Sequence, residues 1–365
     1  MKIILACGGT GGHIFPAFSV AEEIRRRDPS VRIIYVCGRK DIETAIFKIV
    51  SGETVVSIES AAYRGFRSLL SPSFLIKLFK GFGIAFKLIV NEKPDLVAGF
   101  GGHFSFPMAL IARFLGVPTL IHEQNVIPGK ANRVLCKFVN AIALSFPETQ
   151  DYLGLKKNFR VTGNPIRSAI EKDCRNEALE FFHFSPEKRT LLVLGGSQGA
   201  ESINILFLGA LKLLPDAFRE KIQVLHLCGK MAITTTEEAL SKVGISGRAY
   251  SFFERMDLVY GVTDLALGRA GATFLAEIDA KQIPAILVPY PLADGHQLVN
   301  AKIFCRNHDA MIAEQKDLTS ENLAEVLEQF LTRLSKKDRS AVISANRKNS
   351  RGLLADYMMD IAGKK

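Results

Sequence analysis

Short apolar runs alternate along the chain with longer segments in which apolar and polar residues recur at helical spacing. The runs are Ile3–Cys7, Val31–Cys37, Leu96–Gly99, Thr119–His122 and Ala141–Ser145 in the first half, then Leu191–Leu194, Gln223–Cys228, Leu265–Leu267 and Ala285–Pro289. Helix-like segments such as Pro16–Arg26 and Ile203–Leu213 lie between them. Apolar runs that alternate with helices are typical of parallel, doubly wound sheets. The pattern therefore predicts an α/β fold.

Two segments about half a chain length apart resemble each other. The first apolar run leads into Gly8-Gly9-Thr10-Gly11-Gly12, and Leu191–Leu194 leads into Gly195-Gly196-Ser197-Gln198-Gly199-Ala200. Each is a strand-like run, a glycine turn and a helix-like stretch, so we expect two α/β domains that open in the same way. The breaker cluster Gly163-Asn164-Pro165 marks the boundary between residues 1–163 and 164–340.

Charge and cysteine content narrow the class of protein. The 47 Lys and Arg exceed the 37 Asp and Glu, and the net charge of +10 suits nucleic acid, anionic lipid or a phosphorylated substrate. The six cysteines are scattered without a Cys-x-x-Cys pair, which disfavours a disulfide framework or a zinc site. No uncharged stretch reaches the roughly 20 residues that span a bilayer. We expect a soluble or peripheral protein of the cytoplasm.

The glycine loops are candidate phosphate sites. A glycine turn before a helix lets backbone amides approach a phosphate, and Thr10 and Ser197 add hydroxyl donors. The dinucleotide motif G-x-G-x-x-G fails, because Ile14 and Thr10 stand where glycine is needed, and no Walker A loop is present. The alternative is that these glycines serve only tight turns. The presence of two such loops at equivalent places in the two halves argues against that alternative.

Several motifs, taken in order, resemble one family of bacterial enzymes. They are Gly8–His13, Gly99–Gly102, His122–Asn125, Gly163–Arg167, Gly195–Ala200, Arg269–Ala272, Glu277 and His296–Ala301. Together they resemble the undecaprenyldiphospho-muramoylpentapeptide β-N-acetylglucosaminyltransferases, which make lipid II for peptidoglycan and so serve cell shape and division. The resemblance covers nearly the whole chain.

The resemblance implies the fold, the reaction and the partners. It implies a GT-B fold, in which two Rossmann-like domains face across a cleft, with a helix in residues 341–365 packing back on the first domain. The donor would be UDP-N-acetylglucosamine. The acceptor would be lipid I, whose C4 hydroxyl attacks with inversion at the cytoplasmic face of the inner membrane. Other cell-wall proteins are further candidate partners, and nucleic acid is not expected, because part of the charge lies in one apolar segment.

The resemblance also assigns residues. His13 becomes the candidate base, with Glu123 as a possible assistant. The donor site comprises Thr10, Gly11, Gly12, Asn125, Arg167, Ser197, Phe253, Ala272, Thr273, Phe274, Leu275, Ala276, Glu277 and Gln297. In this set Ser197 and Arg167 would meet the diphosphate, Glu277 the ribose and the Phe253 backbone the uracil. The acceptor loops are Gly8, Gly9, Gly101, Gly102 and His103. The chain has no Asp-x-Asp motif, so no metal or other cofactor is expected to be required.

Residues 60–91 combine five basic residues and many apolar ones with no acid before Glu92. The candidate membrane-facing residues are Phe74, Leu75, Lys77, Phe79, Lys80, Phe82, Phe86 and Lys87. At 100° per residue the three lysines share one helix face and the apolar residues lie opposite, a pattern suited to an anionic bilayer interface. A core helix with solvated lysines is the alternative, and Gly81 and Gly83 weaken the helix prediction.

The chain departs from the family pattern at His103, where tyrosine is usual, and at Cys7, Lys281-Gln282 and Ala293–Gly295. Another UDP-sugar glycosyltransferase or a UDP-N-acetylglucosamine 2-epimerase would share the nucleotide site. An inert, membrane-peripheral nucleotide-sugar-binding scaffold is the alternative of another class, and His13, Glu277 and Gln297 argue against it. A dehydrogenase is disfavoured by the failed dinucleotide motif.

Overall fold

The computed structural model describes residues 1–38, 54–60, 71–156, 158–195, 200–229, 231, 233–291, 295–334 and 349–363. The chain forms two compact units, Met1–Arg167 with Lys348–Lys365 and Ser168–Arg347. The division therefore lies just after the breaker cluster at Gly163–Pro165, and the C-terminal segment joins the first unit.

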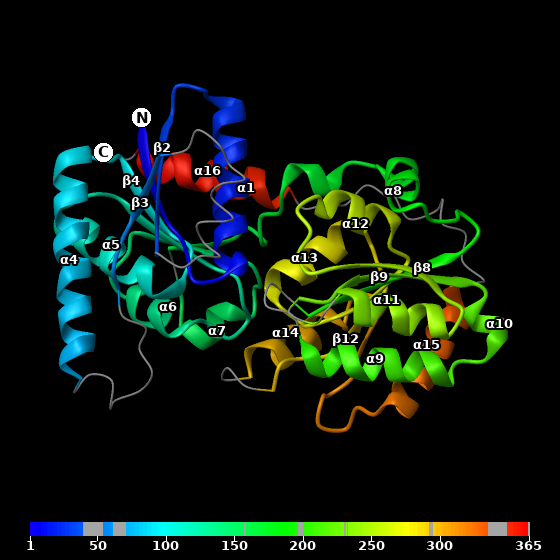
Figure 1. Cartoon of the computed structure of the whole chain (residues 1–365). Helices are drawn as coiled ribbons and strands as arrows, with labels where there is room; N and C mark the ends of the chain where they lie inside the picture. Colours follow the sequence, from blue (N-terminus) through cyan, green and yellow to red (C-terminus); the bar gives the residue numbers. More distant parts are fainter. Residues whose placement is uncertain are drawn as a thin grey trace. The chain divides into compact units, whose positions relative to one another are not determined.

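The first unit holds a parallel sheet with helices on both faces. Its elements are β1 (Lys2–Ala6), α1 (Gly11–Arg27), β2 (Arg32–Cys37), β3 (Thr54–Ser57), α4 (Pro72–Glu92), β4 (Leu96–Gly99), α5 (Gly102–Phe114), β5 (Thr119–Glu123), α6 (Lys130–Leu135), β6 (Ala141–Leu144), α7 (Thr149–Leu153), β7 (Phe159–Val161) and α16 (Ser350–Ala362). The strand order in the described residues is β3-β2-β1-β4-β5-β6-β7. Alternate residues of β1 face opposite cores, Ile3 and Leu5 the core shared with α1 and α16, and Ile4 and Ala6 the core shared with α4 and α5. Figure 1 shows these helices around the sheet.

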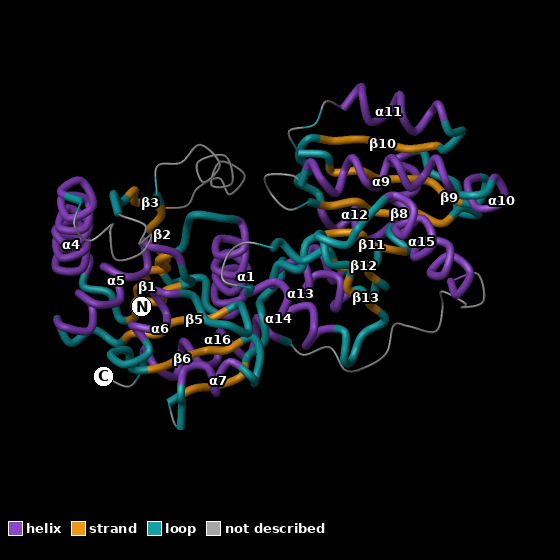
Figure 2. Tube along the Cα trace, turned by 90° about the horizontal axis from the view of Figure 1, so that it is seen from below, coloured by secondary structure: helices purple, strands orange, loops and turns teal. Residues whose placement is uncertain are grey.

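The second unit repeats this plan. Its elements are the 3₁₀ helix η1 (Ser168–Glu171), α8 (Arg175–Phe182), β8 (Arg189–Leu194), α9 (Glu201–Leu213), α10 (Asp216–Arg219), β9 (Ile222–Leu227), α11 (Ile233–Lys242), β10 (Ser246–Tyr250), α12 (Met256–Val262), β11 (Leu265–Gly268), α13 (Ala272–Ala280), β12 (Ala285–Leu287), α14 (His296–Phe304), β13 (Ala310–Ile312) and α15 (Ser320–Leu334). Figure 2 shows the order β10-β9-β8-β11-β12-β13. Residues of β8, β9 and β11 share a core with α9 and α15. The predicted α/β fold with two doubly wound sheets is confirmed.

Two details differ from the prediction. α1 begins at Gly11 rather than Pro16, so that Pro16 lies inside the helix and His13 falls in its first turn. The four strands β3, β7, β10 and β13 were not predicted, and all four are sheet edges. An edge strand is less enclosed and does not need a continuous apolar run, so its sequence carries a weaker signal.

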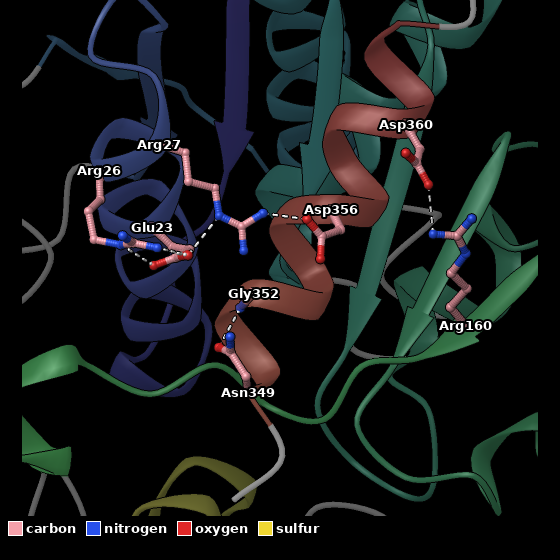
Figure 3. Close-up of polar contacts among 8 residues, drawn as sticks. All are labelled: Glu23, Arg26, Arg27, Arg160, Asn349, Gly352, Asp356 and Asp360. Carbon is pink, nitrogen blue, oxygen red and sulfur yellow. Dashed lines mark hydrogen bonds and ion pairs between the residues drawn. The ribbon is translucent and has the colours of Figure 1, made fainter.

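The C-terminal helix α16 fastens onto the first unit (Figure 3). Asn349 caps it by accepting a hydrogen bond from the Gly352 amide at 2.8 Å. Arg27 pairs with Asp356, and Arg160 pairs with Asp360 at 2.8 Å. The residues of both ion pairs are exposed, and each exposed pair contributes about 1 kcal/mol or less to the free energy of unfolding. The buried side chains of the helix, with Leu354 and Met358 fully enclosed, contribute most of the stabilisation.

Candidate functional site

In the first unit the candidate loops meet where the strand order reverses. β1 and β4 are neighbours, and Ala6 pairs with Gly99 at their carboxyl ends. The chain leaves β1 toward β2 on one side and leaves β4 toward β5 on the other. Ligands of open α/β sheets bind outside the carboxyl ends of the strands at such a switch point. The glycine loops that follow β1 and β4 therefore occupy the expected position.

His13 is held between these two loops. The Nδ1 atom lies 3.0 Å from the carbonyl oxygen of Gly8. A carbonyl only accepts, so Nδ1 is the donor in this contact, and in a neutral ring Nε2 is then an acceptor. A Cβ at Gly101 would lie 3.1 Å from Nε2, and one at Gly102 would lie 2.8 Å from the Gly8 carbonyl oxygen. With φ of 96° and 75°, both positions favour glycine, which lets the loops close on the imidazole.

His122 ties several strand ends together. Gln124 Nε2 donates to its Nδ1 at 3.0 Å and lies 2.9 Å from the Phe100 carbonyl oxygen. The opposite ring nitrogen donates to the Gly163 carbonyl at 3.0 Å. Burial holds the pKa of His122 well below its usual value, at about 4. The ring is therefore neutral at pH 7 and links the segments that follow β4, β5 and β7.

Glu123 shapes the loop that carries Asn125. Its carboxylate accepts from the Asn125 amide at 2.9 Å, from the Gly129 amide at 2.9 Å and from Asn132 Nδ2 at 2.8 Å. The side chain is 1% exposed. These three hydrogen bonds hold the loop that follows β5, so the geometry supports a positioning role for Glu123.

The other candidate residues of the first unit lie nearby in sequence and structure. Thr10 is exposed at the start of α1, and its side chain does not cap the helix. The Arg167 guanidinium lies over the Phe15 ring of α1 at 4.4 Å. His103 is in the first turn of α5, where its ring contacts Phe104 with 3.8 Å between centroids. His103 therefore lies on α5, which follows the loop after β4, and Arg167 packs against α1, which follows the loop after β1.

The second unit has a switch point of its own between β8 and β11, where Leu194 pairs with Gly268. The loop after β8 contains Ser197, which lies outside the described residues. The loop after β11 leads into α13, which begins at Ala272. A Cβ at Gly268 would lie 2.6 Å from the Leu194 carbonyl oxygen, so the two strand ends approach closely.

Glu277 and its neighbours lie on α13. Ala272, Phe274, Leu275 and Glu277 are buried, while Thr273 and Ala276 are partly exposed. Glu277 Oε2 accepts a hydrogen bond from the Tyr260 hydroxyl at 2.7 Å. The carboxylate predicted to bind ribose is therefore held by a phenol of α12.

The remaining predicted donor residues are Phe253, in the loop between β10 and α12, and Gln297, in helix α14. Phe253 belongs to an aromatic cluster, with ring centroids 4.8 Å from Tyr250 and 5.4 Å from Phe182. Gln297 lies in the first turn of α14, and its Oε1 accepts from the Tyr290 amide at 2.9 Å. The cluster holds the side chain of Phe253, and Gln297 holds the backbone at Tyr290.

Arg269 is a residue to which the sequence motif gave no role. It is 9% exposed, and its guanidinium donates to the carbonyls of Val288 and Pro289 at 3.1 and 3.4 Å. In the described residues no carboxylate forms an ion pair with it, and burial lowers the pKa of this guanidinium from its usual value. A buried cation that directly follows β11, the strand paired with β8, suits an anionic ligand. In the sequence, the signal for a role of Arg269 was its position directly after the buried strand β11.

α4 presents a large apolar surface to solvent. Gly81, Ala85 and Ile89 face the unit, whereas Phe79 is 69% and Phe86 51% exposed. Other exposed members are Leu75, Ile76, Lys77, Lys80, Lys87 and Val90. Phe82 instead lies against Phe106, and Phe74 is partly buried, so the apolar face is narrower than predicted. In the described part of the chain, no helix combines the length and apolar character needed to cross a bilayer.

The two Rossmann-like units have the architecture of the GT-B class of proteins. The model of the glycosyltransferase family 28 N-terminal domain matches residues 3–144, and that of the C-terminal domain matches residues 190–354. Because these matches span most of the sequence, the chain belongs to glycosyltransferase family 28.

Relatives and solved structures agree with this assignment. The UDP-N-acetylglucosamine--N-acetylmuramyl-(pentapeptide) pyrophosphoryl-undecaprenol N-acetylglucosamine transferase of Halothermothrix orenii is 37% identical, over 93% of this chain and 94% of the relative. The protein of that name from Desulfitobacterium hafniense is 36% identical, over 93% of each. The crystal structure of Acinetobacter baumannii MurG matches with a TM-score of 0.72 and 26% identity, covering 98% of this chain and 99% of that one. A Neisseria meningitidis UDP-GlcNAc 2-epimerase at 12% identity, covering 99% and 100%, with a TM-score of 0.66, shares the fold.

Proposed function

We propose that the chain transfers N-acetylglucosamine from UDP-N-acetylglucosamine to the C4 hydroxyl of the N-acetylmuramoyl group in lipid I, with inversion, and so makes lipid II. The names of relatives at 34–37% identity over at least 90% of the chain support this hexosyltransferase activity. The structural observation that carries the proposal is the position of His13, which two glycine loops enclose at the switch point of the first unit.

His13 acts as the general base. Its Nδ1–H is fixed on the Gly8 carbonyl, so Nε2 accepts the proton of the acceptor hydroxyl. The hydroxyl oxygen attacks the anomeric carbon of the donor sugar from the face opposite the nucleotide. The bond between that carbon and the β-phosphate oxygen breaks, and its electron pair leaves with UDP. The first unit binds the acceptor through Gly8, Gly9, Gly101, Gly102 and His103.

Residues of the second unit bind the nucleotide and compensate the charge of the leaving diphosphate. Glu277 binds the ribose, and the backbone at Phe253 binds the uracil. Ser197 and the buried guanidinium of Arg269 bind the diphosphate. The family resemblance also assigns Arg167 to the diphosphate, and Asn125 and Gln297 to the N-acetylglucosamine. The sequence has no Asp-x-Asp motif, and we propose that catalysis needs no metal ion.

The exposed surface of α4 docks on the cytoplasmic leaflet of the plasma membrane, where lipid I is anchored. Phe79 and Phe86 would enter the interface while Lys80 and Lys87 contact anionic headgroups. Docking would confine the search for the acceptor to the membrane plane. The protein is thereby peripheral, and other cell-wall enzymes are candidate neighbours.

The activity is tested by incubating the protein with UDP-N-acetylglucosamine and a short-chain lipid I analogue. We expect a disaccharide product, and in His13→Gln a kcat lowered at least 100-fold with UDP affinity within twofold, because only the base is lost. His183→Gln, an exposed histidine of the second unit, is the matched control and should retain full turnover.

Each failure has a distinct meaning. Absence of the disaccharide with the wild-type protein would refute the transferase proposal, and conversion of the donor to its 2-epimer would favour the epimerase. Full turnover in His13→Gln would exclude His13 as the base while leaving the activity in place.

A further inference from the structure

His308 lies in the second unit, in the loop between α14 and β13. Its Nδ1 atom lies 2.8 Å from the carbonyl oxygen of Phe304, the last residue of α14. Its Nε2 atom lies 2.7 Å from Oδ1 of Asp279, near the end of α13. The imidazole also stacks on the Phe304 ring, with centroids 3.8 Å apart and an interplanar angle of 8°. The ring therefore joins the C-terminal ends of two neighbouring helices (Figure 2).

Both nitrogens of the His308 ring face hydrogen-bond acceptors. A carbonyl oxygen only accepts, and so does an ionised carboxylate. A neutral imidazole has one N–H, so it can satisfy one of the two contacts and directs its lone pair at the other acceptor. The imidazolium form has an N–H on each nitrogen. The contacts to Phe304 and Asp279 therefore fit the protonated ring, whose charge Asp279 compensates.

The charges around the ring favour the same form. Burial by itself lowers the pKa of His308, but the hydrogen bonds to Asp279 and to the backbone carbonyl, together with the charge of Asp279, raise it above its usual value. In the described part of the chain, Asp279 is the charged group that acts on this ring. The next residue, Asp309, pairs with Arg333 of α15 at 3.4 Å.

The turn after α13 holds the Asp279 carboxylate from another side. Gln282 has φ of 51°, in the left-handed region that favours glycine, and it is one of the departures from the family pattern. Its side-chain amide donates to the Asp279 carbonyl at 2.7 Å and to Asp279 Oδ1 at 3.1 Å. The backbone amide of Ile283 donates to the Ile278 carbonyl at 3.0 Å and closes the helix end. Asp279 Oδ1 is thus placed between Gln282 and His308.

The two helices that His308 joins carry proposed donor residues in their other parts. α13 begins at Ala272 and includes Glu277, and α14 begins at His296 and includes Gln297. Each helix has only nine residues. A tilt at the C-terminal end of so short a helix also displaces its first turn, so a link between these ends affects the geometry of the donor site.

We infer that His308 is a protonation-dependent link between the C-terminal ends of α13 and α14, and that the second unit binds its nucleotide sugar more tightly when the ring carries both protons. The inference rests on the proposed binding of UDP-N-acetylglucosamine. The link is fully formed below about pH 6.5, where an unfolded histidine is also protonated. It is lost as the pH rises through the titration of folded His308, because one nitrogen then directs a lone pair at an acceptor.

The test measures the affinity for UDP-N-acetylglucosamine by calorimetry at pH 6 and pH 8.5 in wild type, His308→Gln and Asp279→Asn. Each variant is compared with wild type at the same pH, so that titration of the ligand cancels. We expect wild type to bind about threefold more tightly than either variant at pH 6, in the range of one exposed ion pair. At pH 8.5 the difference should disappear. His183→Gln, on an exposed histidine of the same unit, is the control and should match wild type at both values.

Nuclear magnetic resonance of the histidine ring nitrogens measures the link without a ligand. The His308 signals, identified by their absence in His308→Gln, should show both nitrogens protonated up to a higher pH in wild type than in Asp279→Asn. Titration at the same pH in both proteins would overturn the inference.

The calorimetric outcomes separate the inference from the proposed function. Equal affinities of wild type and both variants at pH 6, or a difference that persists unchanged at pH 8.5, would overturn the inference and leave the proposed function in place. If wild type did not bind UDP-N-acetylglucosamine, the proposed function would fail together with the effect on affinity. The ring titration would then still decide whether Asp279 holds the protonated His308.

Discussion

Gly81 and Gly83 are two residues apart in α4 but have different surroundings. A Cβ at Gly81 would lie 2.8 Å from the backbone carbonyl oxygen of Glu59, whereas one at Gly83 would meet nothing within 4 Å. Gly81 is therefore required by the close approach of α4 to residues 54–60, and Gly83 only weakens the helix. A residue's identity thus has to be interpreted together with its position on the helix.

The two glycines give a matched pair of variants. Gly83→Ala should raise the free energy of unfolding by about 0.5–1 kcal/mol, since alanine loses less backbone entropy in a helix. Gly81→Ala should lower it by about 1–3 kcal/mol, because the added methyl forces the helix away from a backbone carbonyl. Chemical denaturation followed by far-UV circular dichroism measures both. Equal effects from the two variants would contradict the observed packing of α4.

At the scale of the element, α4 has a packed face and an exposed apolar face. The packed side uses small residues, Gly81 and Ala85, that allow close approach, while Phe79 and Phe86 face solvent. Exposed aromatics at this density are unusual for a surface that only meets water. Lys77, Lys80 and Lys87 lie beside this exposed apolar face. The Nζ atom of Lys80 also lies 3.8 Å from Oε2 of Glu59.

Membrane docking is a prediction about this helix. Phe79→Ser with Phe86→Ser, and separately Lys77→Glu with Lys80→Glu and Lys87→Glu, should each lower binding to vesicles containing anionic lipid at least tenfold. The first pair removes apolar burial, and the charge reversal changes attraction into repulsion. Co-sedimentation measures binding, and thermal melting checks the fold. Ile205→Ser with Leu213→Ser, on exposed positions of α9, is the control. Wild-type binding in both test variants would refute the docking surface.

At the scale of the molecule, two units with one plan bury different titratable groups. Burial holds the pKa of His122 in the first unit and of His226 in the second at about 4. In the second unit burial also raises the pKa of Asp264 to about 6. The histidines are neutral and Asp264 is protonated in the folded protein near pH 5, which is the reverse of their states in an unfolded chain.

The two units should therefore respond differently to acid. Unfolding of the first unit takes up a proton at His122 between about pH 6.5 and 4. Its stability, full above pH 6.5, should fall by up to about 1.4 kcal/mol per pH unit as pH falls toward 4. In the second unit Asp264 releases a proton on unfolding over much of this range and largely offsets the uptake by His226.

Hydrogen exchange of the β5 and β9 peptides, corrected for intrinsic rates, measures the two units separately. His122→Gln should flatten the pH dependence of β5, and Asp264→Asn should make β9 acid-sensitive. An equal fall of protection in both wild-type units would contradict this assignment of protons.

The amino-acid sequence by itself was sufficient for the central strands, the glycine loop after β1 and the family. A central strand is buried on both faces and needs a continuous apolar run, and a loop that touches phosphate or imidazole needs glycine. These requirements are local, so they are visible along the chain. The edge strands β3, β7, β10 and β13 carried no such requirement.

Only the tertiary structure decided which side chains face one another. In the folded structure the Gly101 loop lies against His13, and Glu123 accepts hydrogen bonds from its own loop. Phe79 is exposed to solvent, and the Tyr260 hydroxyl donates to Glu277. These contacts join residues on different elements, and their geometry depends on register and helix packing. The sequence pattern specifies the elements, but the direction of each side chain is fixed only when the elements pack.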